Sequence, residues 1–251
     1  MSPSHSRSHG RMIVPLIAVL VAVGLAPALA GAAPPAALRM GPGFHEPAVG
    51  LCYDLTTKQA DKPSSTKAAV PCEAPHTLMT VKVKRLPKDL RWKALSFDDF
   101  YVPCQRAVID ALGGSAKNQA MSAYDLWWFT PTQAERAKGA KWVRCDIGLH
   151  QGRLGLHQLP ATLGLGTFPF STTESRCLSG RSLFTTSCAQ SHDWRVKSAY
   201  KLSRLPQTRT QYRQAAQRCQ NIVGSRRWAY FGPSALQWKA GNHFMVCFKP
   251  D

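Results

Sequence analysis

The chain has 251 residues, with 32 Lys and Arg residues against 14 Asp and Glu residues, a formal net charge of +18, and eight cysteines. A hydrophobic content of 44% and seven tryptophans exclude a disordered or collagen-like chain, and the length allows one large core or two small ones. The charge is concentrated toward the C-terminal end, since residues 171–251 hold 13 basic and three acidic residues.

The chain begins with the pattern of an export signal. Arg7 and Arg11 precede an uncharged apolar stretch, and an Ala-Leu-Ala triplet ending at Ala30 supplies the small residues of a cleavage site. We expect residues 1–30 to be a signal peptide, with an uncleaved anchor as the alternative, and residues 31–49 to be a linker. The rest of the chain is then extracytoplasmic, either secreted or anchored at the outer face of the cytoplasmic membrane.

Eight cysteines in an exported chain predict disulfides, because thiols outside the cytoplasm are usually oxidised and an even count at orderly spacing indicates a disulfide framework. No two cysteines form a C-x-x-C pair, which argues against zinc ribbons, iron–sulfur sites and thioredoxin-like motifs. The cysteines are Cys52, Cys72, Cys104, Cys145, Cys177, Cys188, Cys219 and Cys247.

The second half of the chain repeats the first. Each half has a His four residues after a Cys, a later Cys, an aromatic-Phe-x-Pro segment, and a final Cys 14 residues after that Pro. These landmarks are Cys72, His76, Cys104, Pro131 and Cys145 in the first half and Cys188, His192, Cys219, Pro233 and Cys247 in the second. Such self-similarity predicts two tandem modules, residues 50–149 and 171–251, joined by a linker over 150–170. Segments 56–69 and 113–123 of the first module have no counterpart, and we expect an exposed loop and an insertion there.

Alternating apolar and basic residues predict a half-buried strand after each matched histidine, over residues 79–83 in the first module and 194–202 in the second. A further strand is predicted to close each module, over residues 141–147 and 243–248.

One helix is predicted in each module. Ser96 and Asp99 have capping-box spacing, and apolar residues at helical spacing follow them up to Gly113. The same periodicity over residues 212–223, with Gly224 as the C-terminal cap, predicts the helix of the second module. The expected fold class is therefore α+β, with two tandem repeats that each contain a small antiparallel sheet, one helix and two disulfides.

Four cysteines allow three pairings in each module. The preferred pairing joins the first cysteine to the second and the third to the fourth, because it closes each repeat on itself and ties the helix to the last strand. The sequence does not exclude the other pairings. The preferred pairs are Cys52–Cys72, Cys104–Cys145, Cys177–Cys188 and Cys219–Cys247.

With these landmarks the chain resembles the septum-formation family of actinobacterial cell-envelope proteins over about residues 48–249. That family is marked by a Gly-Asp-Cys-Phe-like start, a Cys-x-x-Pro-His segment, a later Cys, and a Trp-x-x-Pro and Trp-x-x-Gly-x-Arg-x-x-x-Cys ending. Leu51 stands in place of the Asp, and Ser191 in place of the Pro. The resemblance implies a non-enzymatic role at the division septum or cell surface and brings no catalytic residues. The matching residues are Gly50, Cys52, Tyr53, Cys72, Pro75, His76, Cys104, Trp128, Pro131, Gly139 and Cys145 in the first module, and Cys188, His192, Cys219, Pro233, Trp238, Gly241 and Cys247 in the second.

His76 and His192 are the candidate acid, base or metal-ligating residues, since imidazole serves these roles near neutral pH. The two repeats share no Ser or Asp beside the histidine, which favours a structural role in which the ring bonds a neighbouring backbone group. The sequence also lacks the common hydrolase, zinc-peptidase, phosphate-loop and dinucleotide motifs. We expect a non-enzyme without metal or cofactor, and a cell-wall-active enzyme using His76 or His192 is the alternative.

Two groups of residues are candidates for a binding surface. Arginines lie along and just beyond the second predicted helix, either as an ordinary solvated face or as a surface for anions. Adjacent tryptophans cannot both face the core from a strand, so one is a candidate surface anchor, with core filling as the alternative. The expected partners are an anionic wall polymer, lipid headgroups or an envelope protein, and export argues against nucleic acid. The candidate residues are Arg209, Arg213, Arg218, Arg226, Arg227, Trp127 and Trp128.

Overall fold

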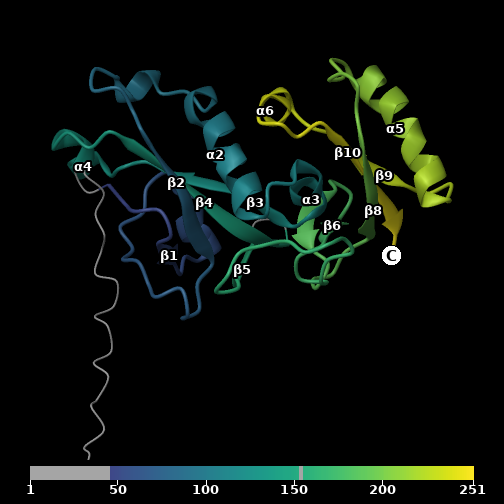
Figure 1. Ribbon diagram of the computed structural model, residues 1–251, viewed down its shortest axis with the longest axis horizontal. Helices are drawn as coiled ribbons and strands as arrows, with labels where there is room; N and C mark the ends of the chain where they lie inside the picture. Colours follow the sequence, from purple (N-terminus) through teal and green to yellow (C-terminus); the bar gives the residue numbers. More distant parts are fainter. Residues whose placement is uncertain (1–45, 153–154) are drawn as a thin grey trace, which may run out of the picture. The chain divides into compact units, whose positions relative to one another are not determined.

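The computed structural model describes residues 46–152 and 155–251, which belong to one compact unit of the chain (Figure 1). The predicted signal peptide and most of the predicted N-terminal linker lie outside the described residues. Among the described helices, none has the length and apolar character needed to cross a membrane.

The first half contains five strands and four α-helices, with one short 3-10 helix. The strands are β1 (Cys52–Tyr53), β2 (Leu78–Arg85), β3 (Tyr124–Phe129), β4 (Trp142–Gln151) and β5 (Gly155–His157). The helices are α1 (Thr57–Ala60), α2 (Asp98–Ala111), α3 (Ala116–Met121) and α4 (Gln133–Ala137), and the 3-10 helix covers Trp92–Ala94.

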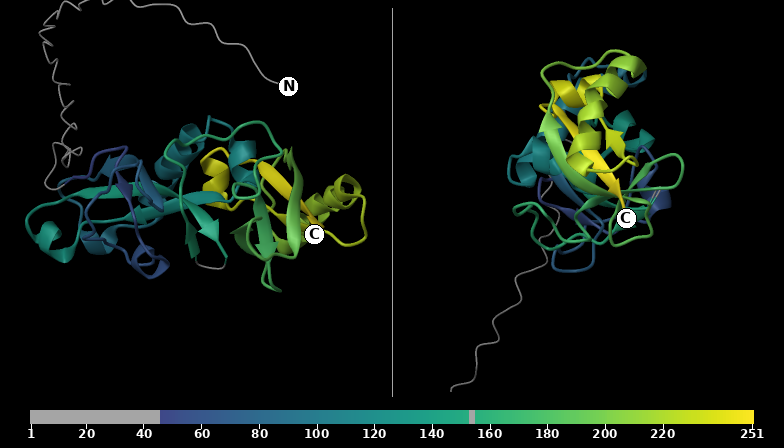
Figure 2. Two further views of the ribbon diagram at one scale, coloured as in Figure 1. Left: turned by 90° about the horizontal axis from the view of Figure 1, so that it is seen from below. Right: turned by 90° about the vertical axis from the view of Figure 1, so that its right-hand side faces the viewer.

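The second half contains five strands and two helices. The strands are β6 (Arg176–Ser179), β7 (Phe184–Ser187), β8 (Trp194–Lys201), β9 (Ala229–Phe231) and β10 (Phe244–Pro250), and the helices are α5 (Arg209–Val223) and α6 (Ala235–Lys239). The two views of Figure 2 show α5 lying along one side of the second sheet.

Each half forms one antiparallel sheet, and the two sheets have the same strand order. The first sheet runs β1-β2-β4-β3, with β5 also pairing with β4, and the second runs β7-β6-β8-β10-β9. Strands β6, β8, β10 and β9 thus take the places of β1, β2, β4 and β3. The predicted fold class, an α+β chain with two repeated antiparallel sheets, is confirmed.

A β-bulge recurs at the same place in both halves. In β2 the register against β4 leaves Val81 without a partner, and in β8 the register against β10 leaves Lys197 without one. Both residues lie five positions after a matched histidine, His76 or His192. A bulge inserts one extra residue and bends the strand, so its recurrence shows that the repeat extends to backbone irregularities as well as to cysteines.

The bulge changes which side chains share a face of β8. Val196 packs in one core cluster with Val246, whereas Tyr200 packs against another that contains Met245. A regular strand would place Val196 and Tyr200 on the same face, because side chains alternate with a period of two. The single alternating face predicted for residues 194–202 is therefore wrong beyond the bulge, although the strand itself is present.

All four preferred disulfides are present: Cys52–Cys72, Cys104–Cys145, Cys177–Cys188 and Cys219–Cys247. One disulfide of each half ties the long helix to the central strand that follows it, α2 to β4 and α5 to β10. Seven of the eight cysteines are buried, and no described cysteine is free. Four disulfides in one chain indicate folding in an oxidising compartment outside the cytoplasm.

The predicted helices form, with small differences at their starts. Helix α2 begins at Asp98, and the carboxylate of Asp99 accepts a hydrogen bond from the backbone N–H of Ser96 at 2.8 Å. Ser96 Oγ accepts from the N–H of Asp98 instead of that of Asp99, so the predicted capping box is only half formed. Helix α5 ends at Val223 and is capped by Gly224, whose φ of 68° is the left-handed conformation expected of a glycine cap.

The predicted insertion of the first half is a helix that packs on the second sheet. Ala120 and Met121 of α3 belong to the same buried cluster as the strands of the second half. Just after α3, Ser122 pairs with Ser175, and the carbonyl of Ser122 accepts a hydrogen bond of 2.7 Å from Nε of the buried Arg176. The first half therefore supplies part of the core of the second.

Much of the stretch predicted as a linker, residues 150–170, packs on the first sheet. Strand β4 continues to Gln151, β5 pairs with it, and Leu159, Leu163 and Leu165 pack with the core beneath. Leucines of the predicted linker are thus buried against the first sheet.

Candidate functional site on the second half

Helix α5 is held firmly against the second sheet. Its N-terminus is capped by Thr208, whose hydroxyl accepts a hydrogen bond from the N–H of Gln211. Its apolar side, with Ala216 and Cys219 fully buried, packs over Met245, and the disulfide to β10 fixes the contact. The sequence places the small residues on this side and the arginines elsewhere, so the basic side chains point away from the core.

We call the five predicted arginines of this region, Arg209, Arg213, Arg218, Arg226 and Arg227, the arginine face. All five are exposed, and within the described residues none of them forms an ion pair. Helix α5 contains no acidic residue, and its 15 residues span roughly 22 Å at 1.5 Å per residue. By helix geometry Arg209 and Arg213 lie on one flank of the exposed side of α5 and Arg218 on the other, with Arg226 and Arg227 just beyond the helix.

Two members of the arginine face lie over aromatic rings of β8. The guanidinium carbon of Arg218 is 4.9 Å from the ring centre of Tyr200, and that of Arg227 is 5.7 Å from the ring of Trp194. Such cation–π contacts orient a guanidinium without neutralising its charge. The Tyr200 hydroxyl donates to the carbonyl of Ala215, which fixes the ring on the helix.

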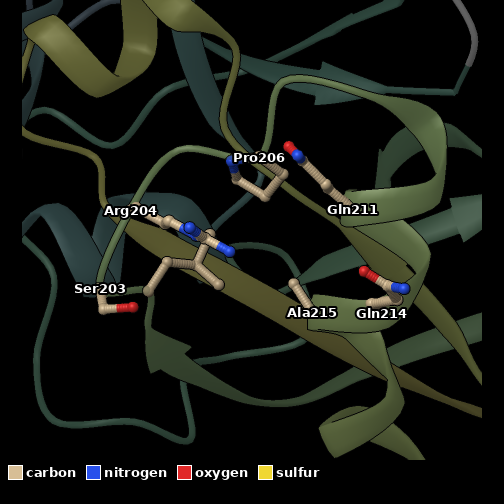
Figure 3. A pocket seen from close by; sticks show the side chains of 7 residues that line it. Ser203, Arg204, Pro206, Gln211, Gln214 and Ala215 are labelled. Carbon is tan, nitrogen blue, oxygen red and sulfur yellow. The ribbon is translucent and has the colours of Figure 1, made fainter.

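A small pocket of about 170 Å³ adjoins the arginine face at the start of α5 (Figure 3). Arg204 and Ser203 come from the loop after β8, and Gln211 and Gln214 come from the helix. Gln211 uses its side-chain oxygen to accept from the N–H of Gln207, at 2.7 Å. Arg204 and the two glutamines add guanidinium and amide donors beside the arginines, which suits hydroxyl and phosphate oxygens.

The three acidic residues of the second half are engaged elsewhere. Glu174 accepts a hydrogen bond of 2.7 Å from the Ser171 hydroxyl, and Asp193 accepts one of 2.7 Å from the N–H of Gly180. Asp251 is used in a cluster at the start of β8, described next. No carboxylate of the described residues therefore counters the arginine face directly, and its positive potential reaches solvent.

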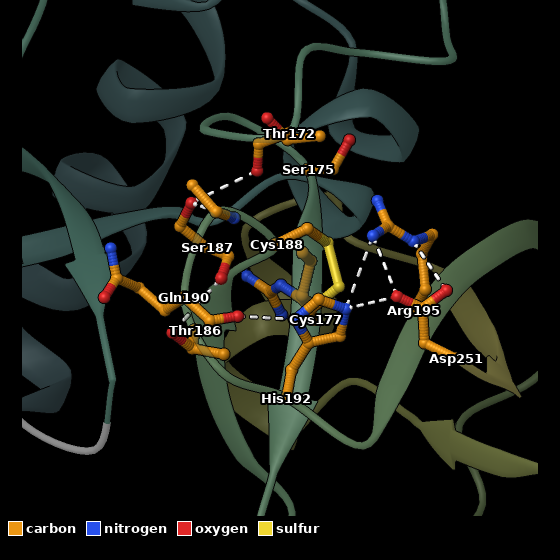
Figure 4. Close-up of a disulfide and its surroundings, with 12 residues drawn as sticks. Thr172, Ser175, Cys177, Thr186, Ser187, Cys188, Gln190, His192, Arg195 and Asp251 are labelled. Carbon is orange, nitrogen blue, oxygen red and sulfur yellow. Dashed lines mark hydrogen bonds and ion pairs between the residues drawn. A yellow bond between two sulfur atoms is a disulfide. The ribbon is translucent and has the colours of Figure 1, made fainter.

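His192 lies beside the Cys177–Cys188 disulfide and contacts a charged pair (Figure 4). Its Nδ1 is 2.6 Å from the carbonyl oxygen of Gln190, and its Nε2 is 2.7 Å from a carboxylate oxygen of Asp251. Arg195 also donates two hydrogen bonds to Asp251, at 3.0 and 2.8 Å. These bonds, those from Arg195 first, hold the pKa of the Asp251 carboxyl well below its ordinary value.

His76 has the same backbone contact but no acidic partner. Its Nδ1 is 2.9 Å from the carbonyl oxygen of Ala74, two residues earlier, as in the second half. The ring is buried, and its Nε2 has no hydrogen-bond partner among the described residues. The position four residues after the last cysteine is Leu149 here and Asp251 in the second half. Both rings thus make the backbone contact predicted for a structural histidine.

Among the described residues, one group has side chains of the types that bind metals. It consists of the sulfurs of Cys177 and Cys188 and a ring nitrogen of His192, and these atoms lie within 4.8 Å of one another. The sulfurs are joined in a disulfide, so they cannot act as the thiolates that bind zinc. The geometry of this group is that of a histidine packed beside a disulfide.

Replacing both histidines by glutamine is expected to leave any wall binding unchanged and to lower the free energy of unfolding by about 1 kcal/mol for each lost hydrogen bond. Urea denaturation and wall sedimentation of the variants H76Q, H192Q and the double variant measure both quantities. Loss of an effect of the protein on wall material, with the stability unchanged, would instead support the enzyme alternative.

Trp127 and Trp128 lie on opposite faces of β3, and both are half-buried. The ring of Trp127 is 5.1 Å from that of His150, while Trp128 packs against Phe100 at 4.9 Å and Phe97 at 6.0 Å. Helix α2 covers one face of the sheet and the loops around β1 cover the other, so each ring finds a cluster. These contacts favour core filling over a surface anchor.

Comparisons of the chain with protein-family models, with curated proteins and with solved structures found no match. The resemblance to the septum-formation family therefore stays a prediction, and the function has to be argued from the residues themselves.

Proposed function

We propose that this protein is a non-enzymatic, extracytoplasmic binding protein of the cell envelope, and that its arginine face binds an anionic wall polymer. The observation that carries the proposal is the helix α5, which exposes arginines without an acidic residue among them. Solubility does not require 13 basic residues against three acidic ones in residues 171–251. A role in septum formation is the biological context that the family resemblance suggests.

A polymer fits this surface better than a lipid bilayer does. A helix that binds membranes inserts an apolar side into the lipid, but the apolar side of α5 is already packed on the second sheet. The solvent side carries arginines, glutamines and Asn221. An extended polyanion needs several cations and hydrogen-bond donors along its length, and the helix supplies arginines on both flanks of its exposed side over roughly 22 Å, with further donors in the adjoining pocket.

Binding of the mature protein to isolated cell wall is expected to weaken by about a hundredfold between ~50 and ~500 mM NaCl, because salt screens the arginines and replaces released counterions. Co-sedimentation over a salt series measures this slope. Equal retention at both ends of the series would show that the basic surface does not carry the binding.

A matched pair of variants separates the arginine face from net charge. We expect binding to fall at least tenfold when the five arginines of the face become glutamine, since each removes one contact to the polymer. Five exposed basic residues of the first half serve as the control, with the same loss of charge and little loss of binding. Vesicles of phosphatidylglycerol and phosphatidylcholine form a second arm, and binding to them in preference to wall would overturn the polymer assignment. The control residues are Lys58, Lys62, Lys88, Arg91 and Lys93.

A further inference from the structure

The repeat allows equivalent sheet positions of the two halves to be compared. In the second half, Leu178, Val246 and Phe248 form a dry, buried face of the sheet. Ala120 and Met121 of α3 cover this face. The position is thus filled entirely by apolar side chains.

In the first half the same three positions are Tyr53, Arg144 and Asp146. Tyr53 follows the first cysteine of its half, and Arg144 and Asp146 flank the fourth, as their counterparts do. The strand register agrees, because β2 pairs with β4 at Arg144 in the way that β8 pairs with β10 at Val246. Tyr53 packs here with Phe129 and with Ala60 of the short helix α1. The first half thus holds a charged pair where the second holds hydrocarbon.

The charged pair is buried and constrained from several sides. Nη2 of Arg144 lies 2.9 Å from Oδ2 of Asp146, and their side chains are 4% and 0% exposed. The N–H is not directed at that oxygen, so the contact is an ion pair without a well-formed hydrogen bond, and Nε of Arg144 has no acceptor among the described residues. Thr80 donates to Oδ1 of Asp146 at 2.8 Å. The guanidinium lies between two aromatic rings. Its carbon is 3.8 Å from the ring centre of Tyr53 and 4.4 Å from that of Phe129.

Arg144 also lines a pocket of about 390 Å³. Part of its wall comes from the segment Ser65–Ala68 in the long loop between the first two cysteines, which are 20 residues apart here and 11 apart in the second half. The loop insertion and the charged pair, both peculiar to the first half, therefore meet at one place. The pocket is lined by Pro47, Leu51, Tyr53, Ser65, Thr66, Lys67, Ala68, Glu135, Trp142 and Arg144.

The fold does not need this ion pair. Two charges lose favourable hydration free energy when they are buried, and their mutual attraction seldom outweighs that loss. Apolar residues of similar size usually give equal or greater stability. The second half shows that Val and Phe fill the two positions in the same sheet. We propose that the pocket is a binding site for a small ligand with one carboxylate and an apolar body, in which Arg144 binds the carboxylate and Asp146 positions the guanidinium.

The charges around the pocket disfavour a dianion. Arg144 and Lys67 supply two positive charges, and Glu135 at the pocket and Asp146 behind it supply two negative ones. A phosphate dianion would need a further cation, whereas the planar guanidinium suits a single carboxylate. Leu51, Pro47 and Trp142 give the walls for the apolar body of the ligand.

The test uses the mature protein with N-benzoylglycine as the probe, its uncharged amide as the matched control ligand, and phenyl phosphate as the competing class. The key variant is the double replacement Arg144→Met and Asp146→Leu, which removes both charges at similar volume. Arg85→Met removes an exposed arginine that is paired with Glu46 outside the pocket lining, and serves as the control variant. Calorimetric titration measures binding, and urea denaturation measures folding.

We expect the wild-type protein and Arg85→Met to bind N-benzoylglycine with a dissociation constant of about 1 mM or tighter, and the amide at least tenfold more weakly. The double variant should stay folded with a similar urea midpoint and lose the binding. Three results would overturn the proposal: no saturable binding of N-benzoylglycine, tighter binding of phenyl phosphate, or an unfolded double variant, which would show that the pair serves the fold.

Discussion

Replacing Arg144 alone by methionine is expected to lower the free energy of unfolding by about 3 to 5 kcal/mol, because it leaves the carboxylate of Asp146 buried without its partner. Asp146 is completely buried, and its one other described side-chain bond comes from Thr80. Urea denaturation of the wild-type protein and the variant measures the difference.

The control is the pair of Arg85 and Glu46, where the arginine side chain is 59% exposed and the glutamate side chain 9% exposed. Arg85→Met should cost less than Arg144→Met, because only Glu46 of this pair is buried and its carboxylate keeps some access to water, whereas that of Asp146 has none. A similar cost for both variants would contradict a special role of burial at Arg144.

The destabilisation caused by Arg144→Met should depend on pH. Burial raises the pKa of the Asp146 carboxyl, and Arg144 opposes this rise. A carboxyl whose pKa is higher in the folded than in the unfolded state takes up a proton on folding, so stability falls as pH rises from the unfolded pKa through the folded one. Without Arg144 the pKa of Asp146 in the folded state should rise further, so the pH range over which stability falls extends to higher pH. The variant should therefore lose more stability near neutral pH than in mild acid, and an unchanged loss across that range would contradict this explanation.

Removing the Cys104–Cys145 disulfide by replacing both cysteines with alanine is expected to cost about 4 kcal/mol, since it closes a stretch of 41 residues. Removing Cys177–Cys188, which closes 11 residues, should cost about 3 kcal/mol. The larger loop loses more entropy when it is closed in the unfolded chain, which sets this order. Urea denaturation of the two double variants under oxidising conditions measures both values.

The reverse order of costs would show that contacts around the bonds outweigh loop closure. The Cys104–Cys145 pair also ties α2 to β4 next to Arg144, so its removal should weaken binding at the pocket, while removal of Cys177–Cys188 should not. Titration with N-benzoylglycine separates the two variants on this second measure.

Much of the fold could be predicted from the sequence because the same landmark residues occur in both halves. The matched histidines correctly predicted the central strands, and the final cysteines the disulfides. Gly224 correctly predicted the end of helix α5. Spacing is informative here since a disulfide and a helix cap each require particular residues at particular distances.

Helices α4 and α6 were not predicted, although the sequence contains a local pattern that marks the start of each. Both are five residues long and begin with a complete capping box, Thr132 with Glu135 and Ser234 with Gln237. Each box follows the matched Pro of its half by one residue. The motif S/T-x-x-E/Q is sufficient to predict a helix start even where the helix is short.

Other features depend on tertiary contacts that no local pattern contains. The bulges at Val81 and Lys197 are defined only by the partner strands. Arg144 and Asp146 occupy the polar positions of an ordinary strand in the sequence, whereas in the structure the Arg144 guanidinium is enclosed by Phe129 and by Tyr53, which lies more than 90 residues earlier in the chain. The arginine face was readable as a charge run, but only the packing of α5 shows that its arginines are free of carboxylates.

The position of α3 in the chain determines which of the two packed surfaces is synthesised first. The helix that covers the second sheet is encoded before that sheet, so a chain that emerges from its N-terminus already carries the covering surface when Leu178 and Val246 appear. The covering helix belongs to the first half. A separately expressed second half, residues 171–251, is therefore expected to expose this apolar face and to aggregate, so its arginines are best studied in the intact chain.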